Sequence, residues 1–226
     1  MAVPPPLARV RHGPKSLTAT LHSGYEGHSI CARKGVDPMF EVRIHGRRGQ
    51  GVLATAELLA IAASMEGRRA QASSEVDAGD AAAEVAAWCR IGDPEPGEHR
   101  PHALVVQDAA LLEHLADELP DDGYLLVNSG LRIDNLGLSP LALRPERTIT
   151  VPATEIAVKL TGHRRPGPAL AGAFAALTGV VSLDSVLAAI RQRFGGEAGR
   201  MSAAAAMATF GIVRTEIGDV SAMRPH

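Results

Sequence analysis

Apolar and polar residues alternate along one short segment and then recur at helical spacing. Residues 40–44 alternate apolar and polar and end at Gly46, which predicts a strand. From about Gln50 to Met65 apolar residues recur every three or four positions, which predicts a helix that Gly67 ends. A strand and a helix are therefore expected on either side of one glycine-containing turn.

The alternation of strands and helices continues along the chain. Short apolar runs bounded by proline, glycine or aspartate predict buried strands at 103–107, 124–128 and 148–151, and weaker strands are expected near 70–72 and 85–91. Helices are predicted at 109–118, 154–160, 170–177, 182–194 and about 200–217. This order predicts an α/β fold with a mostly parallel sheet and helices on both faces.

Residues 1–38 differ from the patterned segment that begins at Met39. They are rich in proline, keep no period, and hold five basic residues against two acidic ones, so their charge is +3 and that of the remainder is −5. We therefore divide the chain into a flexible N-terminal extension (1–38), one domain (39–218) and a C-terminal tail (219–226). For the extension, a translation start at Met39 and a transit peptide stay open as alternatives.

Composition narrows the classes of function. Hydrophobic residues make up 46% of the 226, enough for a core, while 3% aromatic residues argue against stacking on single-stranded nucleic acid. A net charge of −2 gives no electrostatic case for DNA or an anionic membrane, and no apolar run is long enough to span a bilayer. We expect a cytoplasmic protein. The distant Cys31 and Cys89 exclude a disulfide scaffold and a self-contained four-cysteine iron–sulfur cluster.

The sharpest candidate for a site is the turn between the first strand and the first helix. It consists of Gly46, Arg47, Arg48, Gly49, Gln50 and Gly51. Glycines let the backbone approach a ligand closely, the N–H groups of a first helical turn favour an anion, and two arginines would add charge. The spacing differs from the dinucleotide fingerprint, and no Lys-Ser/Thr follows to make a P-loop. An anion site and a tight packing turn both remain open interpretations.

An ordered set of short motifs supports a family resemblance. They lie at 42–46 and 49–52, then at 105–108, 121–128, 151–157, 172–174 and 178–183. Together they resemble the gamma subunit of 2-oxoacid:acceptor oxidoreductases, most of all that of pyruvate:ferredoxin oxidoreductase. The resemblance implies a Rossmann-like domain of three layers, within an enzyme that oxidatively decarboxylates a 2-oxoacid with coenzyme A.

The resemblance also implies a division of labour. The partners would be alpha and beta subunits, with a delta, ferredoxin-like subunit as a further candidate, and ferredoxin would accept the electrons. Thiamine diphosphate and iron–sulfur clusters would be held by the other chains. This chain is expected to hold no cofactor or metal alone, to supply no catalytic residue, and to be inactive alone. The turn from Gly46 to Gly51 would contribute to binding coenzyme A or another anion.

The chain departs from the family pattern in three places. Arg48 stands where a third glycine is usual, acidic residues replace an arginine pair within 74–82, and Gly167–Pro168 replaces Asn-Thr. The sequence at 74–76 also resembles the indolepyruvate oxidoreductase beta subunit. Such a beta-type subunit and a stand-alone or regulatory Rossmann-like binding module are therefore the alternatives. A dehydrogenase that acts alone with NAD fits the glycine spacing poorly.

Other side chains that could take part in binding or catalysis also have structural interpretations. We expect packing or solvated loops to explain His45, Cys89, His99, His102, the acidic Asp77, Asp80 and Glu84, and the pair Arg164 and Arg165. Asp108 and Asn128 follow buried strands, where α/β sheets place their ligand crevice. Capping of the helix that follows explains each residue equally well, so both roles stay open.

Overall fold

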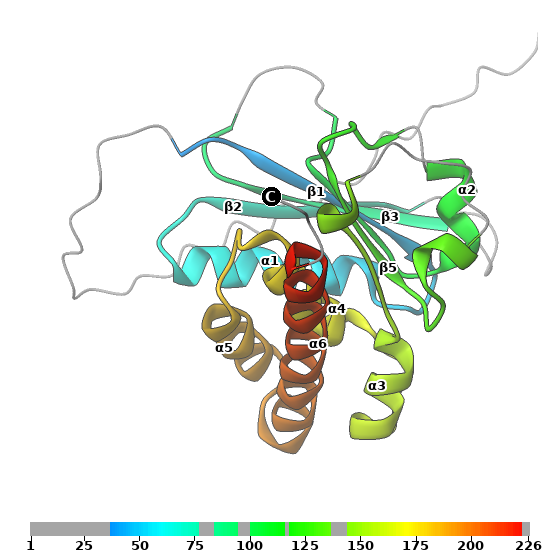
Figure 1. Cartoon of the computed structure of the whole chain (residues 1–226). Helices are drawn as coiled ribbons and strands as arrows, with labels where there is room; N and C mark the ends of the chain where they lie inside the picture. The colour runs from blue at the N-terminus through cyan, green and yellow to red at the C-terminus, as the bar shows by residue number, and fades with distance from the viewer. Residues whose placement is uncertain (1–36, 77–83, 95–99, 116–117, 137–143, 223–226) are drawn as a thin grey trace, which may run out of the picture.

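A six-stranded sheet forms the centre of the domain (Figure 1). The computed structural model describes residues 37–76, 84–94, 100–115, 118–136 and 144–222. The strands are β1 (Phe40–Arg47), β2 (Ala70–Val76), β3 (Glu84–Ile91), β4 (Ala103–Val106), β5 (Tyr124–Asn128) and β6 (Thr148–Val151). Their order is β2-β3-β1-β4-β5-β6, and only β3 runs against the other five of these strands.

Helices cover the two faces of this sheet unequally. One face carries α1 (Val52–Met65), α3 (Ala153–Thr161), α4 (Gly167–Thr178), α5 (Leu183–Phe194) and α6 (Gly196–Ala222), as Figure 1 shows. The other face carries a short 3-10 helix, η1 (Ala109–Leu111), and α2 (Leu112–Leu115); two further 3-10 helices are η3 (Ile133–Asn135) and η4 (Pro145–Arg147). The domain is therefore an α/β structure of three layers.

The strand β4 shows why the sequence has continuous apolar runs there. Ala103 and Val105 face the large helix layer, while Leu104 and Val106 pack with the leucines of η1 and α2. Successive side chains of a strand point to opposite faces, so a strand covered on both sides needs apolar residues at every position. On β1 the alternation differs, because Val42 joins the large core whereas Arg43 lies on the opposite, polar face.

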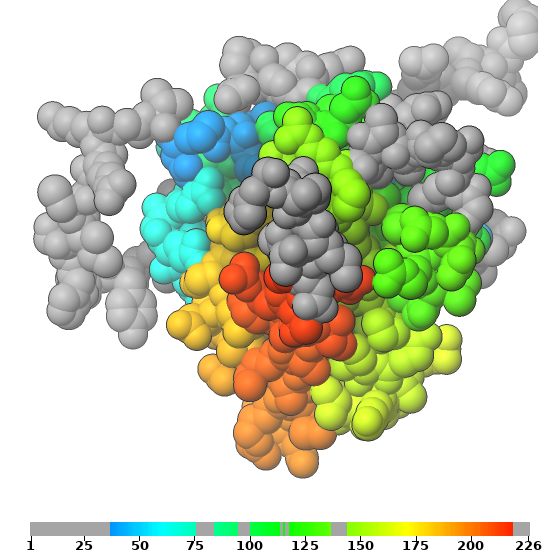
Figure 2. All heavy atoms as spheres, viewed as in Figure 1, coloured from blue at the N-terminus to red at the C-terminus, as the bar shows by residue number. Residues whose placement is uncertain are grey.

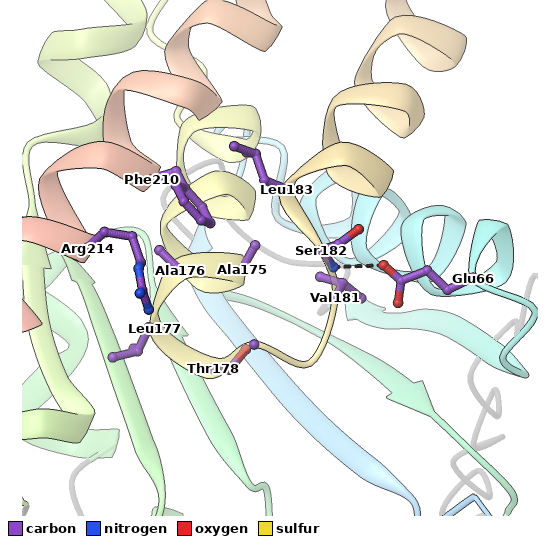
Figure 3. A pocket seen from close by; sticks show the side chains of 11 residues that line it. Glu66, Ala175, Ala176, Leu177, Thr178, Val181, Ser182, Leu183, Phe210 and Arg214 are labelled. Atoms are coloured by element: carbon purple, nitrogen blue, oxygen red, sulfur yellow. Dashed lines mark hydrogen bonds between the residues drawn. The ribbon is translucent and has the colours of Figure 1, made fainter.

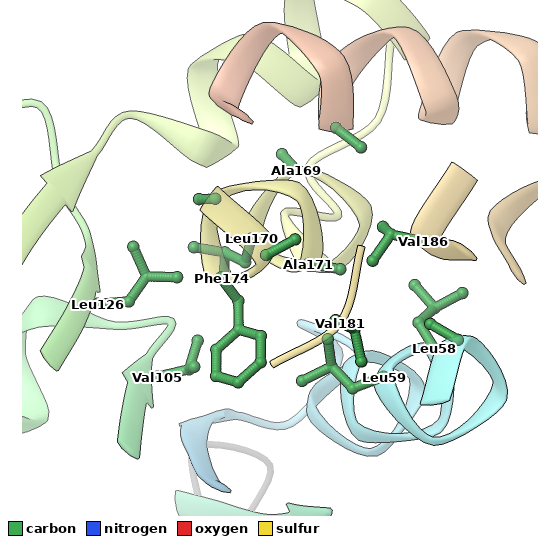
Figure 4. Close-up of a cluster of buried hydrophobic side chains, with 14 of the residues drawn as sticks. Leu58, Leu59, Val105, Leu126, Ala169, Leu170, Ala171, Phe174, Val181 and Val186 are labelled. Atoms are coloured by element: carbon green, nitrogen blue, oxygen red, sulfur yellow. The ribbon is translucent and has the colours of Figure 1, made fainter. Parts of the chain in front are cut away.

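Small residues let the helices approach one another and the sheet. Figure 4 shows Leu170 and Phe174 of α4 among residues from β4, β5 and α1. Gly172 faces the backbone of Ala206 in α6, so that even a single methyl group would not fit between the two helices. The long helix α6 then lies at the surface between α5 and α3 (Figure 2). An alanine-rich core of this kind explains the scarcity of aromatic residues.

The structure confirms the predicted strands and corrects three helix boundaries. The segment predicted as one helix at 109–118 forms η1 and the four-residue α2, with residues 116–117 outside the described part. Helix α4 begins at Gly167 rather than 170, because Pro168 suits a first helical turn. The last helix runs from Gly196 to Ala222 rather than from 200 to 217. None of the helices in the described ranges is long and apolar enough to cross a membrane.

Candidate functional site

The six residues of the predicted site form one closed turn between β1 and α1. Gly49 has φ +89° and Gly51 has φ +78°, left-handed conformations that glycine adopts without strain. The Gln50 N–H donates to the Arg47 carbonyl at 3.1 Å, and the Gln50 Oε1 accepts from the Arg47 N–H at 2.8 Å. These reciprocal bonds fix the backbone of the turn.

The N-cap residue of α1 contributes no capping side chain. Gly51 occupies the N-cap position with no side-chain hydrogen bond, and the first turn of α1 contains no acidic residue. The N–H groups of a first helical turn carry partial positive charge. Arg47 and Arg48 adjoin this end in the sequence, and Arg48 is exposed. The local chemistry therefore favours an anion.

The turn lies at the topological switch point of the sheet. The chain leaves β1 through α1 toward β2 on one side, whereas β4 is followed by β5 on the other side. In open α/β sheets, ligands bind at the carboxyl ends of the strands at such a point. Asp108 follows β4 here, and its Oδ2 lies 2.5 Å from the Arg47 Nε. Its Oδ1 accepts from the Ala110 N–H at 3.1 Å, so Asp108 also caps η1.

The glycines of the turn also allow close packing between β1 and α1. A Cβ on Gly46 would lie 2.7 Å from the Gln50 Oε1, 2.9 Å from the Val52 Cγ2 and 3.0 Å from the Gln107 Cβ. Gly46 is thus required for the close approach of β1 to α1, while Gly49 has no atom within 4 Å of its potential Cβ. Within one turn, Gly46 therefore serves packing, while Gly49 lies in an exposed part of the turn.

Gln107 and Thr55, which the sequence pattern did not single out, hold this region together. Gln107 is 1% exposed, and its Nε2 donates to the Thr55 Oγ1 at 2.8 Å, while no described atom bonds its Oε1. A Cβ on Gly167 would lie 2.5 Å from the same Thr55 hydroxyl. The first turns of α1 and α4 therefore meet beside the end of β4. A glutamine that ends an apolar run was the available signal.

Two comparisons with curated relatives and one family model identify the chain. The model for pyruvate ferredoxin/flavodoxin oxidoreductase matches residues 41–212. The chain belongs to this family. The pyruvate/ketoisovalerate oxidoreductases common subunit gamma of Pyrococcus abyssi is 36% identical over 189 residues, 80% of this chain and 100% of that protein. Pyruvate synthase subunit PorC of Methanocaldococcus jannaschii is 36% identical over 74% of this chain and 93% of its own length.

Solved structures of similar fold agree with this assignment. The pyruvate oxidoreductase subunit PorC of Thermotoga maritima superposes with a TM-score of 0.66 at 29% identity, covering 76% of this chain and 96% of that one. A 2-oxoglutarate:ferredoxin oxidoreductase of Magnetococcus marinus shares the fold at 14% identity and a TM-score of 0.62, with 78% of this chain matching 31% of that one. The chain is therefore a gamma subunit of a 2-oxoacid:ferredoxin oxidoreductase, an enzyme that works as a multi-subunit complex.

Two of the other candidate residues in this gamma subunit have structural roles. The Asn128 Oδ1 accepts from the Thr154 N–H at 3.0 Å, and its Nδ2 donates to the Gln107 carbonyl at 2.8 Å, so it caps α3 and joins it to β4. His45 is buried on the polar face of β1, with its Nδ1 3.0 Å from the Glu84 Oε1. Strand alternation places it on the face opposite α1.

The remaining candidates lie away from the turn or outside the described residues. Burial raises the pKa of the Cys89 thiol to about 12, so it stays protonated. The His102 Nδ1 accepts from the Glu41 N–H at 3.0 Å, and Arg164 and Arg165 are exposed before α4. Cys31, Asp77, Asp80 and His99 lie outside the described residues.

The described residues offer no set of ligands for a metal. Among them, no group of three His, Cys, Asp or Glu side chains is arranged to hold a metal ion. An iron–sulfur cluster needs several thiolates, whereas the described ranges contain a single cysteine, Cys89. A resident cluster therefore does not fit the described part of this chain.

One hollow of the gamma subunit lies at the far end of its helix layer. It measures about 750 Å³ and lies between the end of α4, the start of α5 and α6 (Figure 3). Leu183 and Phe210 line it, together with Glu66, whose Oε1 accepts from the Ser182 N–H at 2.7 Å. Glu66 follows the last residue of α1, whereas the turn precedes its first, so about 20 Å of helix separates the two places.

Proposed function

We propose that this gamma subunit binds an anionic group of coenzyme A at the turn from Gly46 to Gly51. In this proposal the complex uses coenzyme A to decarboxylate a pyruvate-like 2-oxoacid oxidatively. The observation that carries the proposal is the uncapped N-terminus of α1, flanked by Arg47 and Arg48 at the β1–β4 switch point. Phosphate groups are the anions that such a helix end favours, and coenzyme A carries several.

Two further observations support coenzyme A over an unspecified anion. The solved structure of the Magnetococcus marinus oxidoreductase, which has the same fold, has 2-oxoglutarate, coenzyme A and succinyl-CoA bound. The turn is also accessible, because Arg48 and Gly49 are exposed while the backbone behind them is fixed by Gln50. An exposed, rigid turn can bind a phosphate without paying the entropy of ordering a loop.

We further propose how the labour is divided within the complex. Alpha and beta subunits hold thiamine diphosphate, other chains hold the iron–sulfur clusters, and ferredoxin accepts the electrons. A delta, ferredoxin-like subunit is a candidate carrier of those clusters. The gamma subunit completes the assembly through its domain at 39–218, with 1–38 and 219–226 as appended segments, in the cytoplasm.

The ligand proposal is tested by titrating coenzyme A into the full-length chain and into the assembled complex. Arg47→Ala should weaken binding about tenfold or more, because a charge-assisted hydrogen bond contributes about 1.5–3 kcal/mol. Arg214→Ala is the matched control, since it removes the same charge beside the distant hollow. Equal affinity in the two variants would contradict the proposal.

The partner proposal is tested by co-purification from native extract with identification of the subunits. We expect alpha and beta chains with bound thiamine diphosphate, and ferredoxin reduction that requires coenzyme A. Turnover of pyruvate, 2-ketoisovalerate and indolepyruvate then identifies the 2-oxoacid. A preference for indolepyruvate would replace the pyruvate-like substrate with the beta-type alternative, and recovery as a homo-oligomer would favour the stand-alone module.

A further inference from the structure

Asp108 lies across the switch point from the candidate turn and is ion-paired with it. Its Oδ2 contacts the Arg47 Nε, and the pair connects the end of β4 to the end of β1. We infer that Asp108 determines which anions the turn accepts, because a ligand has to compete with it for Arg47. The inference rests on the proposed function of the turn and adds the class of anion that it selects.

The two partners of this ion pair differ in how firmly they are held. Asp108 is held by a second bond, since its Oδ1 accepts from the Ala110 N–H and caps η1. The backbone of Arg47 is fixed by Gln50, but its side chain is long and 41% exposed, against 23% for Asp108. Exchange of partners therefore moves the Arg47 side chain, while Asp108 and the backbone of the turn stay in place.

This arrangement favours phosphate over carboxylate. A monocarboxylate that replaces Asp108 on Arg47 exchanges one carboxylate contact for an equivalent one, so it gains nothing at the guanidinium. A phosphate or pyrophosphate carries more charge and more acceptor oxygens, and it also reaches the N–H groups of α1. Asp108 therefore keeps small carboxylates, including a 2-oxoacid, from the turn and leaves it to phosphate-bearing ligands.

The repulsion between Asp108 and an incoming anion acts in the same direction. A partly buried carboxylate close to the turn weakens the binding of every anion somewhat, whether or not Arg47 takes part. Competition for Arg47 can be measured separately from this general repulsion. The effect of competition on anion affinity disappears when Arg47 is removed, whereas the effect of repulsion remains. A double-mutant cycle between positions 47 and 108 separates the two effects.

The experiment measures binding of inorganic pyrophosphate and of acetate to the full-length chain by calorimetry. Asp108→Asn keeps an oxygen to cap Ala110 and removes the charge. It should bind pyrophosphate about threefold tighter and narrow the preference for pyrophosphate over acetate. The same substitution in an Arg47→Ala background should change affinity by less than about twofold. Asp184→Asn in α5 is the charge-matched control, and Asp108→Ser provides a second variant if Asp108→Asn folds poorly.

Three outcomes are possible, and each decides a different question. Tighter binding that depends on Arg47 supports the inference. Unchanged affinity in Asp108→Asn, or an equal gain with and without Arg47, overturns the inference while leaving the turn as an anion site. If the parent chain and Asp108→Asn both fail to bind pyrophosphate, and coenzyme A titration of the complex does not respond to Arg47→Ala, the proposed function fails as well.

Discussion

The N-termini of helices α5 and α1 differ in how they are capped. At α5 the Ser182 side chain accepts from the Ser185 N–H at 3.2 Å, Asp184 lies in the first turn, and the Glu66 carboxylate accepts from the Ser182 N–H. At α1 the N-cap residue is Gly51, which has no side chain to cap the helix, the first turn contains no acidic residue, and Arg47 precedes it. Both helices pack on the same core, so their surroundings alone do not explain the difference.

Under the proposed function, this difference means that the chain forgoes some stability at α1 in favour of binding. A capping side chain contributes about 1 kcal/mol, and α5 shows that this chain can supply one. Leaving α1 uncapped at the ligand edge of the sheet keeps its N–H groups available to an outside anion. The hollow between α4, α5 and α6 lies beside the capped helix instead, where Glu66 is already bonded.

The largest expected effect comes from closing the space at the entry to α1. Gly46→Ala should lower the free energy of unfolding by about 2–3 kcal/mol, because the new methyl group meets Val52 and Gln107 in a packed region. The equivalent change before α5 is Gly179→Ala, where no atom lies within 4 Å and only φ +64° opposes the substitution. It should cost about 1 kcal/mol. Urea denaturation of both variants measures the contrast, and equal losses would contradict it.

The second effect removes the cap that distinguishes α5. Ser182→Ala should lower the free energy of unfolding by about 1 kcal/mol and leave pyrophosphate binding unchanged, because the cap serves only the helix. Ser64→Ala is the matched control, since this exposed hydroxyl bonds a carbonyl within α1 and caps nothing. A change in anion affinity on removing Ser182 would mean that the two helix ends are coupled.

Local pattern predicted the elements well because the local physics is strong. A strand covered on both faces must be apolar throughout, as in β4, and glycines at 49 and 51 indicate left-handed turns. The segment at 109–118 was wrong as a single helix, because Asp108 starts a 3-10 turn there instead. Helix period alone does not distinguish three residues of 3-10 helix from a first α-helical turn.

The sequence predicted only part of the candidate site, because the residues that contact the turn are distant from it in the sequence. The six residues of the turn are contiguous and follow a strand, so their placement could be expected. The contacts that define their chemistry connect Arg47 to Asp108 and Thr55 to Gln107, separations of 61 and 52 positions. The order of the strands in the sheet decides such contacts, and the hydrophobic periodicity of the sequence does not predict that order. The contact of Glu66 with Ser182, 116 positions apart, is of the same kind.

The third prediction converts α1 into a helix end that resembles α5. Ala54→Glu places a carboxylate at the third position of the first turn, where it favours the helix dipole. It should raise the free energy of unfolding by about 0.5 kcal/mol and weaken pyrophosphate binding about tenfold. Ala54→Gln controls for side-chain size. Greater stability without loss of binding would separate the uncapped helix end from the anion site.

The smallest effect is a pH dependence confined to α5. Burial acts to raise the pKa of Glu66, but hydrogen bonds from Ser182 and Ser185, together with the charge of Arg68, outweigh it and place the pKa below its ordinary 4.5. A carboxyl whose pKa is lowered by folding stabilises the fold above its unfolded pKa and loses that contribution as pH falls through the folded value. Because Glu66 is exposed, solvent screens its charge, so Glu66→Gln should cost only about 0.3 kcal/mol near neutral pH. The cost should disappear as pH falls below 4.5 and through the folded pKa. Urea denaturation of both proteins across this range measures it. A difference that persists in acid would mean that Glu66 acts by packing rather than by charge at the N-terminus of α5.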